Sequence, residues 1–200
     1  MQWKLFSFMD LIFATHNSHK LEEIQELVAD AGIRLRSLTD IGCRDEIDEI
    51  GDTFEANATI KSSYVFQHFG LNCFADDSGL EVDALHGKPG IYSARYSGSR
   101  DPKLNLELLL ERMQCQTNRK ARFVSVISLV MDGETHLFRG EVEGNLATEC
   151  AGVAGFGYDP IFIPNGYAYT FAEMSLADKN RISHRSKALA QLFQFLKSRA

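Results

Sequence analysis

Two adjacent carboxylates, Asp76 and Asp77, form the first pattern in this sequence that could do chemistry, with Asp48 and Glu49 upstream. Oxygen ligands of this kind suit Mg²⁺, which keeps several waters and bridges to substrate phosphates. A carboxylate beside such an ion can also orient or deprotonate a water molecule. Side chains alternate along a strand, so only one of the pair is expected to face a site. The alternative is a plain turn, because Asp, Ser and Gly in 76–79 all favour turns.

A second pattern, residues 15–20 (THNSHK), contains hydroxyl, amide and ammonium groups between an expected strand and an expected helix. The unpaired N–H groups and partial positive charge at a helix N-terminus favour phosphate. The segment is neither a Walker A loop nor a Rossmann fingerprint, because it lacks their glycines. A phosphate-binding loop and an ordinary capped turn are equally good interpretations of these residues alone.

Two further patterns lie near the C-terminus. The loop 155–160 (GFGYDP) offers close backbone approach at its glycines, a stacking face at Phe156 and an acceptor at Asp159. Taken alone, a tight loop around a core aromatic explains it better. The segment 179–185 (KNRISHR) clusters cations where the last helix begins, and there they oppose the helix dipole. An anionic or carbonyl-bearing ligand would explain that placement, and a solvated charged face is the alternative.

The elements that must position these residues follow from periodicity and end signals. The expected strands are 9–15, 72–75, 80–85, 121–130 and 135–144, with a polar turn at 75–79 and an Asp-Gly hairpin turn at 132–133. The expected helices are 20–31 ending at Gly32, 53–69 between Asp52 or Thr53 and Gly70, one opened by Asp101-Pro102, and 184–199 capped by Ser183. Early interleaving and a late hairpin predict a mixed sheet with helices packed on it.

Composition limits the classes of protein. Two hundred residues, 44% of them hydrophobic, fit one domain spanning 1–200 with no separable linker. A net charge of −6 argues against nonspecific electrostatic binding to nucleic acid. An acidic protein that binds a polyanionic ligand needs a few cationic side chains at the site and usually a divalent metal.

Cysteine spacing and hydropathy indicate the cellular setting. The four cysteines are widely separated, which favours a reducing, cytoplasmic setting over zinc binding or a disulfide framework. Asp10 interrupts the apolar N-terminal run and no small-residue cleavage site follows, so a signal peptide is disfavoured. No stretch reaches the ~20 apolar residues of a membrane span.

Together, a phosphate cradle, a metal site, a stacking loop and a polar cluster are the parts of a nucleotide-hydrolysing site. The segments that contain them resemble the successive motifs of the inosine triphosphate pyrophosphatase (Ham1-like) family. These segments are FATHNSHKLEEI, DTFEANATIKS, FADDSGLEVDALHGKPGIYSARYSG, GFGYDPIFIP and TFAEMSLADKNRISHRSKAL. They occur in the family's order and span about residues 11 to 190.

The resemblance implies an elongated α/β fold, with a long mixed sheet flanked by helices and two lobes around a central cleft. It implies Mg²⁺-dependent hydrolysis of ITP, dITP and XTP to the monophosphate and pyrophosphate, usually by a homodimer. The task of such an enzyme is to remove deaminated purines from the nucleotide pool.

The resemblance also implies residue roles. Asp77 matches the general base and a metal ligand, and Glu49 matches the other metal ligand, with Asp48 as the alternative. The substrate-binding positions implied at the phosphate end are Thr15, His16, Asn17, Ser18, His19, Lys20, Lys61 and Ser78. Those implied at the base end are Phe156, Gly157, Tyr158, Asp159, Lys179, His184 and Arg185. His16 lies where many members of that family have glycine, and His19 lies where a small residue is more common. His19 either adds a proton-sensitive donor or faces solvent.

Base selection has a physical basis in this hypothesis. Hypoxanthine and xanthine carry an acceptor oxygen at position 6 where adenine carries an amino donor, so the donors of Lys179, His184 and Arg185 would disfavour adenine. How guanine is excluded does not follow from the sequence. Two other readings remain: a pyrophosphatase of pyrimidine nucleotides, which residues 179–185 argue against, and a nucleotide-binding regulator, which has no need of a general base.

Overall fold

The computed structural model describes residues 9–28 and 33–199, which form a six-stranded mixed sheet in the order β2-β1-β3-β4-β5-β6. The strands are β1 Met9–Phe13, β2 Ile33–Ser37, β3 Cys73–Val82, β4 Lys120–Met131, β5 Glu134–Leu146 and β6 Phe162–Pro164. The α-helices are α1 Ser18–Val28, α2 Phe54–Phe69, α3 Pro102–Met113, α4 Leu176–Ile182 and α5 His184–Arg199. Strands β1, β2 and β3 are parallel, and β3 to β6 are antiparallel.

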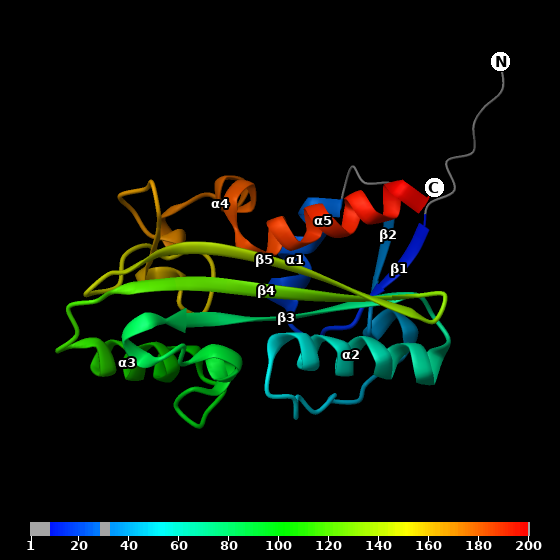
Figure 1. The fold of residues 1–200 in the computed structure, drawn as a ribbon, viewed down its shortest axis with the longest axis horizontal. Coiled ribbons are helices and arrows are strands. Elements are labelled where there is room, and N and C mark those ends of the chain that lie inside the picture. Colours follow the sequence, from blue (N-terminus) through cyan, green and yellow to red (C-terminus); the bar gives the residue numbers. More distant parts are fainter. Residues whose placement is uncertain (1–8, 29–32, 200) are drawn as a thin grey trace, which may run out of the picture.

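Helices cover both faces of the sheet in an elongated molecule (Figure 1). Helices α2 and α3 lie on one side of the long strands, and α4 and α5 lie on the other. Helix α1 shares a core with α5, in which Ile24 and Val28 are buried in one apolar cluster with Leu189 and Leu192. A separate core surrounds α3, where Leu109 packs near Phe162. The mixed sheet flanked by helices is confirmed.

Capping chemistry defines the ends of the helices that the sequence predicted best. The Thr53 hydroxyl accepts a hydrogen bond from Ala56 N at the start of α2, and Gly70 ends that helix with a left-handed φ of 65°. The Asp101 carboxylate caps α3 through Lys103 N, with Pro102 in the first turn. Ser183 Oγ accepts from Ser186 N at the start of α5, as expected.

The late hairpin is also confirmed. Its turn residues Asp132 and Gly133 both have positive φ, 53° and 85°, which matches the twist of the flanking strands. The strands β4 and β5 extend beyond the expected limits at both ends and pair from Met131↔Glu134 to Lys120↔Asn145.

The expected turn at 75–79 is wrong, because these residues form the middle of β3. Every residue of β3 pairs with β4, from Cys73↔Val130 to Val82↔Ala121. The ladder satisfies the backbone polar groups of buried residues, and this tertiary pairing overrides the turn preference of Asp, Ser and Gly. The strand expected at 80–85 therefore ends at Val82, and Asp83–Leu85 is a 3₁₀ turn.

An interruption in sheet pairing beside β3 creates space for a site. Strand β1 pairs with β3 only at Cys73 and Phe74, and Ala14 N then donates to Phe74 O at 2.7 Å. The chain turns away into α1 after this point. On that side, within the described residues, β3 beyond Phe74 has only an isolated bridge from Glu81 to Pro89. Ligand sites of open α/β sheets lie in such a gap beyond the carboxyl end of a strand.

Some elements escaped the sequence analysis, namely β2, β6, α4 and the 3₁₀ turn Gly90–Arg95. The expected stop at Gly32 and the N-terminal residues 1–8 lie outside the described residues. None of the described helices is long and apolar enough to cross a lipid bilayer.

Candidate active site

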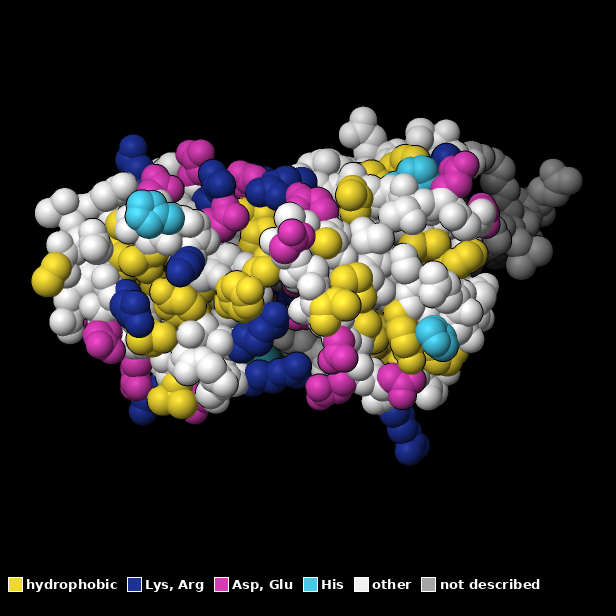
Figure 2. Space-filling view, turned by 60° about the horizontal axis from the view of Figure 1, so that its bottom comes forward, with side chains coloured by type: hydrophobic (Ala, Val, Ile, Leu, Met, Phe, Trp, Pro, Cys, Tyr) yellow, Lys and Arg dark blue, Asp and Glu magenta, His cyan; other side chains and the backbone are white. Residues whose placement is uncertain are grey.

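A cavity of about 670 Å³ lies beside the middle of β3 and brings together residues from most of the chain. Figure 2 shows a hollow near the middle of the molecule with Lys and Arg side chains on one rim and Asp and Glu side chains on the other. The predicted site residues that line it are Thr15, His16, Asn17, His19, Lys20, Glu49, Lys61, Asp77, Ser78, Phe156, Gly157, Tyr158, Asp159, Lys179, His184 and Arg185. Ser18, the first residue of α1, is the one predicted substrate-binding residue that does not line it.

The loop between β1 and α1 presents its polar groups to this cavity. Asn17 N donates to Thr15 Oγ1, and the Asn17 side chain accepts from Lys20 N at 3.1 Å. The Asn17 cap supports the first turn of α1 and leaves part of the helix N-terminus facing the cavity. His16 Nε2 lies 3.0 Å from Asp45 O, which links this loop to the segment that carries Glu49.

Asp76 and Asp77 point to opposite faces of β3, as alternation along a strand requires. Asp77 lines the cavity, where its carboxylate accepts from Asn57 Nδ2 and Lys61 Nζ, each at 3.3 Å. Asp76 is fully buried behind it and makes ion pairs with Lys20 at 2.7 Å and Arg185 at 3.1 Å. Asp77 is therefore the member of the pair that a ligand can reach.

Lys61 connects Asp77 to Glu49. Its ammonium donates to Glu49 Oε1 at 2.8 Å, to Asp76 O at 2.7 Å and to Asp77 Oδ1 at 3.3 Å. Glu49 lines the cavity while Asp48 is exposed and does not, so the geometry favours Glu49 over Asp48 as the companion of Asp77.

Burial and neighbouring charges set the protonation of these groups. Burial raises the pKa of Asp77, and the charges of Lys61 and Lys20 offset this only in part. Burial acts in the same direction on Glu49, but there the charge and hydrogen bond of Lys61 outweigh it and hold its pKa below the usual value. Asp77 is thus more basic than an ordinary aspartate and Glu49 less basic than an ordinary glutamate, which suits Asp77 to the role of proton acceptor.

The other end of the cavity is built around Lys179. Its ammonium lies 2.7 Å from both Glu23 Oε1 and Asp159 Oδ2, and 5.1 Å from the centroid of the Phe156 ring. Asp159 also accepts from Phe156 N at 2.9 Å, which fixes the loop that presents the ring. An aromatic face beside paired polar groups is an arrangement that can hold a heteroaromatic ring and read its edge.

Arg185 connects the two ends. It pairs with Glu23 and Asp76 and donates to Ser78 Oγ at 3.0 Å. His184 stacks on Phe123 with ring centroids 4.9 Å apart, and its buried Nδ1 has no hydrogen-bond partner among the described residues. Burial, together with the charges of Arg185 and Lys179, holds the pKa of His184 well below its usual value, so its ring is neutral at pH 7.

One argument from the sequence needs correction. Lys179 belongs to α4, a separate helix that Ser175 caps and that ends at Ile182. Lys179 lies in the last turn of that helix, where a cation is favourable, so the expected conflict with the final helix dipole is wrong for this residue. His184 and Arg185 do lie in the first turn of α5.

The sequence analysis also missed residues that the structure places in or directly behind the cavity. Glu23 and Asn57 lie within expected helices and carry no pattern of their own. Both are buried, which is unusual for Glu and Asn and needs polar partners. Arg95 lines the cavity from the 3₁₀ turn Gly90–Arg95, within a segment that resembles a family motif but in which the sequence analysis assigned this residue no role. For His19 the sequence allows either a solvent-facing or a donor role, and the structure stacks its ring on that of Phe156, with the ring centroids 5.4 Å apart.

The carboxylates fit Mg²⁺ but not a metal held by protein alone. Among the described residues, no group of three or more His, Cys, Asp or Glu side chains is placed to hold an ion. Asp77 and Glu49 supply two carboxylates around Lys61 in an open cavity. Mg²⁺ commonly binds through one or two carboxylates, with waters and substrate phosphates completing its shell.

Fold and cavity together define an α/β protein whose cleft combines anion-binding groups at one end with ring-binding groups at the other. A model of the Ham1 family matches residues 11–195. This chain therefore belongs to the Ham1 family.

Relatives and solved structures agree with the family. The dITP/XTP pyrophosphatase of Christiangramia forsetii is 50% identical over 189 residues, covering 94% of this chain and 99% of that protein. The dITP/XTP pyrophosphatase of Bacillus subtilis is 42% identical, covering 94% and 98%. The Ham1 protein of Staphylococcus aureus has a similar structure, with a TM-score of 0.86 at 38% identity, covering 96% of this chain and 100% of that one. A HAM1 protein from Coxiella burnetii gives a TM-score of 0.87 at 37% identity, covering 95% and 99%.

Proposed function

We propose that this chain hydrolyses deaminated purine nucleoside triphosphates, namely ITP, dITP and XTP, to the monophosphate and pyrophosphate. The observation that carries the proposal is one cavity with Asp77, Glu49 and Lys61 at one end and Phe156 and Lys179 at the other. Relatives of 42–50% identity that match more than nine-tenths of the chain are dITP/XTP pyrophosphatases, which supports the same substrates.

In the proposed reaction Asp77 accepts a proton from the water that attacks the α-phosphorus. Its buried carboxylate is more basic than an exposed one, which favours proton transfer near neutral pH. Lys61 and Lys20 supply positive charge beside the phosphates. Asp77 and Glu49 would hold Mg²⁺, whose charge stabilises the oxygens of the departing pyrophosphate.

At the base end Phe156 stacks on the purine while Lys179 and Arg185 donate to the oxygen at position 6. Both cations are held by Glu23, so their donors are pre-oriented. Adenine would place an amino donor against these donors, and each unsatisfied buried polar group costs about 1–3 kcal/mol. The neutral His184 adds a ring nitrogen to the same region.

Product analysis tests the proposal directly. The purified protein is incubated with Mg²⁺ and ITP, XTP, dITP, ATP, GTP, dTTP or UTP, and pyrophosphate and orthophosphate are measured separately. We expect pyrophosphate with the monophosphate, and kcat/KM for ITP and XTP well above that for ATP. Release of orthophosphate with a diphosphate, a preference for pyrimidines, or binding without hydrolysis would each contradict the proposal.

The homodimer and the cytoplasmic setting that the sequence analysis expected are part of the same proposal. The homodimer depends on the resemblance to the family and the cytoplasmic setting on the cysteine spacing. Sedimentation of the purified chain measures the first.

A further inference from the structure

Arg95 is a half-buried cation of the cavity with no role in the reaction so far. It ends the 3₁₀ turn Gly90–Arg95, and its side chain is 32% exposed. Its Nη1 lies 3.3 Å from Glu49 Oε2, and its Nη2 donates to Glu49 O at 3.5 Å. Arg95 therefore shares Glu49 with Lys61, at the acidic end of the cavity.

The backbone that carries Arg95 is closely docked against β3. A Cβ atom at Gly79 would lie 2.4 Å from Gly90 O and 2.5 Å from Ser93 Oγ, so only glycine permits this approach. Ser93 Oγ accepts from Leu80 N at 2.9 Å, and Tyr158 OH donates to Ser93 O at 2.9 Å. The turn is thus fixed both to the strand that carries Asp77 and to the base-end loop.

The inner groups do not carry enough positive charge for a polyanionic substrate. Lys20, Lys61 and Arg185 are matched by the three carboxylates of Glu49, Asp76 and Asp77, so this cluster has no net positive charge. Lys61 already donates to three acceptors, which is the full capacity of an ammonium group. Even with a divalent cation between the carboxylates, a triphosphate needs further donors from this chain.

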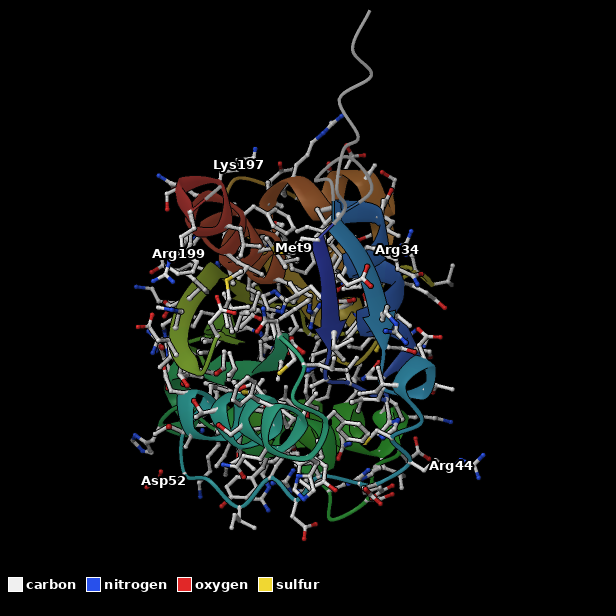
Figure 3. The ribbon with its side chains drawn as sticks, turned by 90° about the vertical axis from the view of Figure 1, so that its right-hand side faces the viewer. Met9, Arg34, Arg44, Asp52, Lys197 and Arg199 are labelled. Carbon is white, nitrogen blue, oxygen red and sulfur yellow. The ribbon has the colours of Figure 1, made fainter. Side chains whose placement is uncertain are left out.

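Arg95 is the cavity arginine best placed to supply them. Its guanidinium has five N–H groups, and the described contacts to Glu49 use only two nitrogens. Of the three other arginines that line the cavity, Arg185 is buried in ion pairs with Glu23 and Asp76, and Figure 3 shows Arg44 extending away from the body of the protein. Arg100 is paired with Glu46 at 3.6 Å, with both side chains almost fully exposed.

We infer that Arg95 binds the β- and γ-phosphates of the substrate, exchanging its contact with Glu49 for phosphate oxygens. This inference rests on the proposed function. Contacts run from Asp77 through Lys61 and Glu49 to Arg95, so with the α-phosphorus beside Asp77 the arginine meets the departing pyrophosphate. A guanidinium matches two phosphate oxygens at once, and its departure frees the Glu49 oxygen for a cation.

Calorimetric binding to wild type and Arg95→Ala tests the inference, with Mg²⁺ present. The two probes are inosine α,β-imidotriphosphate, which cannot be cleaved at the α-phosphorus, and IMP, which lacks the β- and γ-phosphates. We expect Kd for the imidotriphosphate to rise about tenfold to a hundredfold in Arg95→Ala. Kd for IMP should stay within about twofold, as the loss of one phosphate contact leaves base binding intact. Arg95→Lys, which keeps the charge without the planar fork, should lie between the two.

Arg112→Ala is the matched control, because Arg112 is an exposed arginine of α3 that does not line the cavity. We expect its affinities for both probes to equal those of wild type. Unchanged imidotriphosphate binding in Arg95→Ala would overturn the inference, and so would equal weakening of both probes, which indicates a structural effect. If wild type released no pyrophosphate from any nucleotide, the proposed function would fail as well. Normal wild-type turnover with unchanged Arg95→Ala binding would overturn the role of the arginine alone.

Discussion

Asp76 and Asp77 are neighbours in the chain but belong to two different ion networks. Asp76 is buried on one face of β3, where it pairs with Lys20 and Arg185, while Asp77 faces the cavity on the other with Asn57 and Lys61. Burial favours the neutral form of both, yet the two cations hold the pKa of Asp76 well below its usual value, whereas the pKa of Asp77 is raised. The same residue type is therefore structural in one position and chemically basic in the next.

The first prediction contrasts these two carboxylates. Asp77→Asn should lower kcat by about 10²- to 10⁴-fold, the contribution of a general base, without lowering the unfolding temperature. Asp76→Asn should lower the unfolding temperature, because Lys20 and Arg185 lose a buried counter-charge. A loss of about 3 kcal/mol corresponds to roughly 6–12 °C in a chain of this size. Kinetics and calorimetric unfolding of both variants measure this, and near-normal turnover of Asp77→Asn would reject its role as base.

The second prediction concerns pH. Burial raises the pKa of Asp77, so its ionised, base form is lost at a higher pH than that of an exposed Asp as the solution is acidified. The value of kcat/KM should therefore fall on the acid side with a midpoint above 3.8. His184 should add no midpoint near 6.5, because its pKa is held well below that value. The residual rate of Asp77→Asn should lack the acid limb, and an unchanged limb in that variant would assign it to another group.

The third prediction separates base stacking from base reading. Phe156→Leu should raise KM for ITP and for ATP by about tenfold each, because stacking does not distinguish one purine from another. Lys179→Gln should instead reduce the ratio of kcat/KM for ITP over ATP by about tenfold, because one of the donors to the 6-oxygen changes. Steady-state kinetics with both substrates measure the two effects. An unchanged ratio in Lys179→Gln would remove Lys179 from base selection.

The fourth prediction concerns magnesium. Two carboxylates around one lysine make a weak site for the ion alone, so chelation by EDTA should abolish turnover and leave the unfolding temperature unchanged. Glu49→Gln should raise the Mg²⁺ concentration needed for half-maximal turnover, and Asp48→Asn should not, because the exposed Asp48 does not line the cavity. Magnesium titrations of turnover decide between the two residues. The opposite pattern would make Asp48 the ligand.

The fifth prediction concerns the backbone contact at Gly79. Gly79→Ala places a methyl group 2.4 Å from Gly90 O, so the turn that carries Arg95 must move away from β3. Overpacking of this kind costs about 1–3 kcal/mol. We expect a lower unfolding temperature together with a raised KM for ITP. Wild-type values for both would show that the turn can shift freely.

The sequence predicted the parts of the fold that have local causes. Helix α2 follows from Thr53 and Gly70, and the β4–β5 hairpin follows from Asp132 and Gly133, since capping and turn geometry act between near neighbours. The middle of β3 was interpreted wrongly because its conformation depends on pairing with β4, a segment far along the chain. The turn preference of residues 75–79 is a local property and contains no information about pairing with β4.

The candidate site divides in the same way. Residues 15–20 and 156–159 carry unusual chemistry in short segments, which made them visible in the sequence. Glu23, Asn57 and Arg95 are ordinary in their own segments, and only the fold shows that two are buried and the third lines the cavity. Their contacts with Lys179, Asp77 and Glu49 join positions remote in sequence, and one sequence without partners contains no signal for such pairs.

Asp77 lies in a strand that pairs with β4 at every residue, and this limits how the site can diverge. The ladder with β4 fixes its backbone along the whole length of β3, so the carboxylate proposed as the base keeps its position when surrounding loops change length or composition. The residues proposed to bind the purine and the outer phosphates, by contrast, project from loops and helix ends. Loop substitutions in such proteins can therefore change substrate preference without changing the position of the carboxylate that would orient the attacking water.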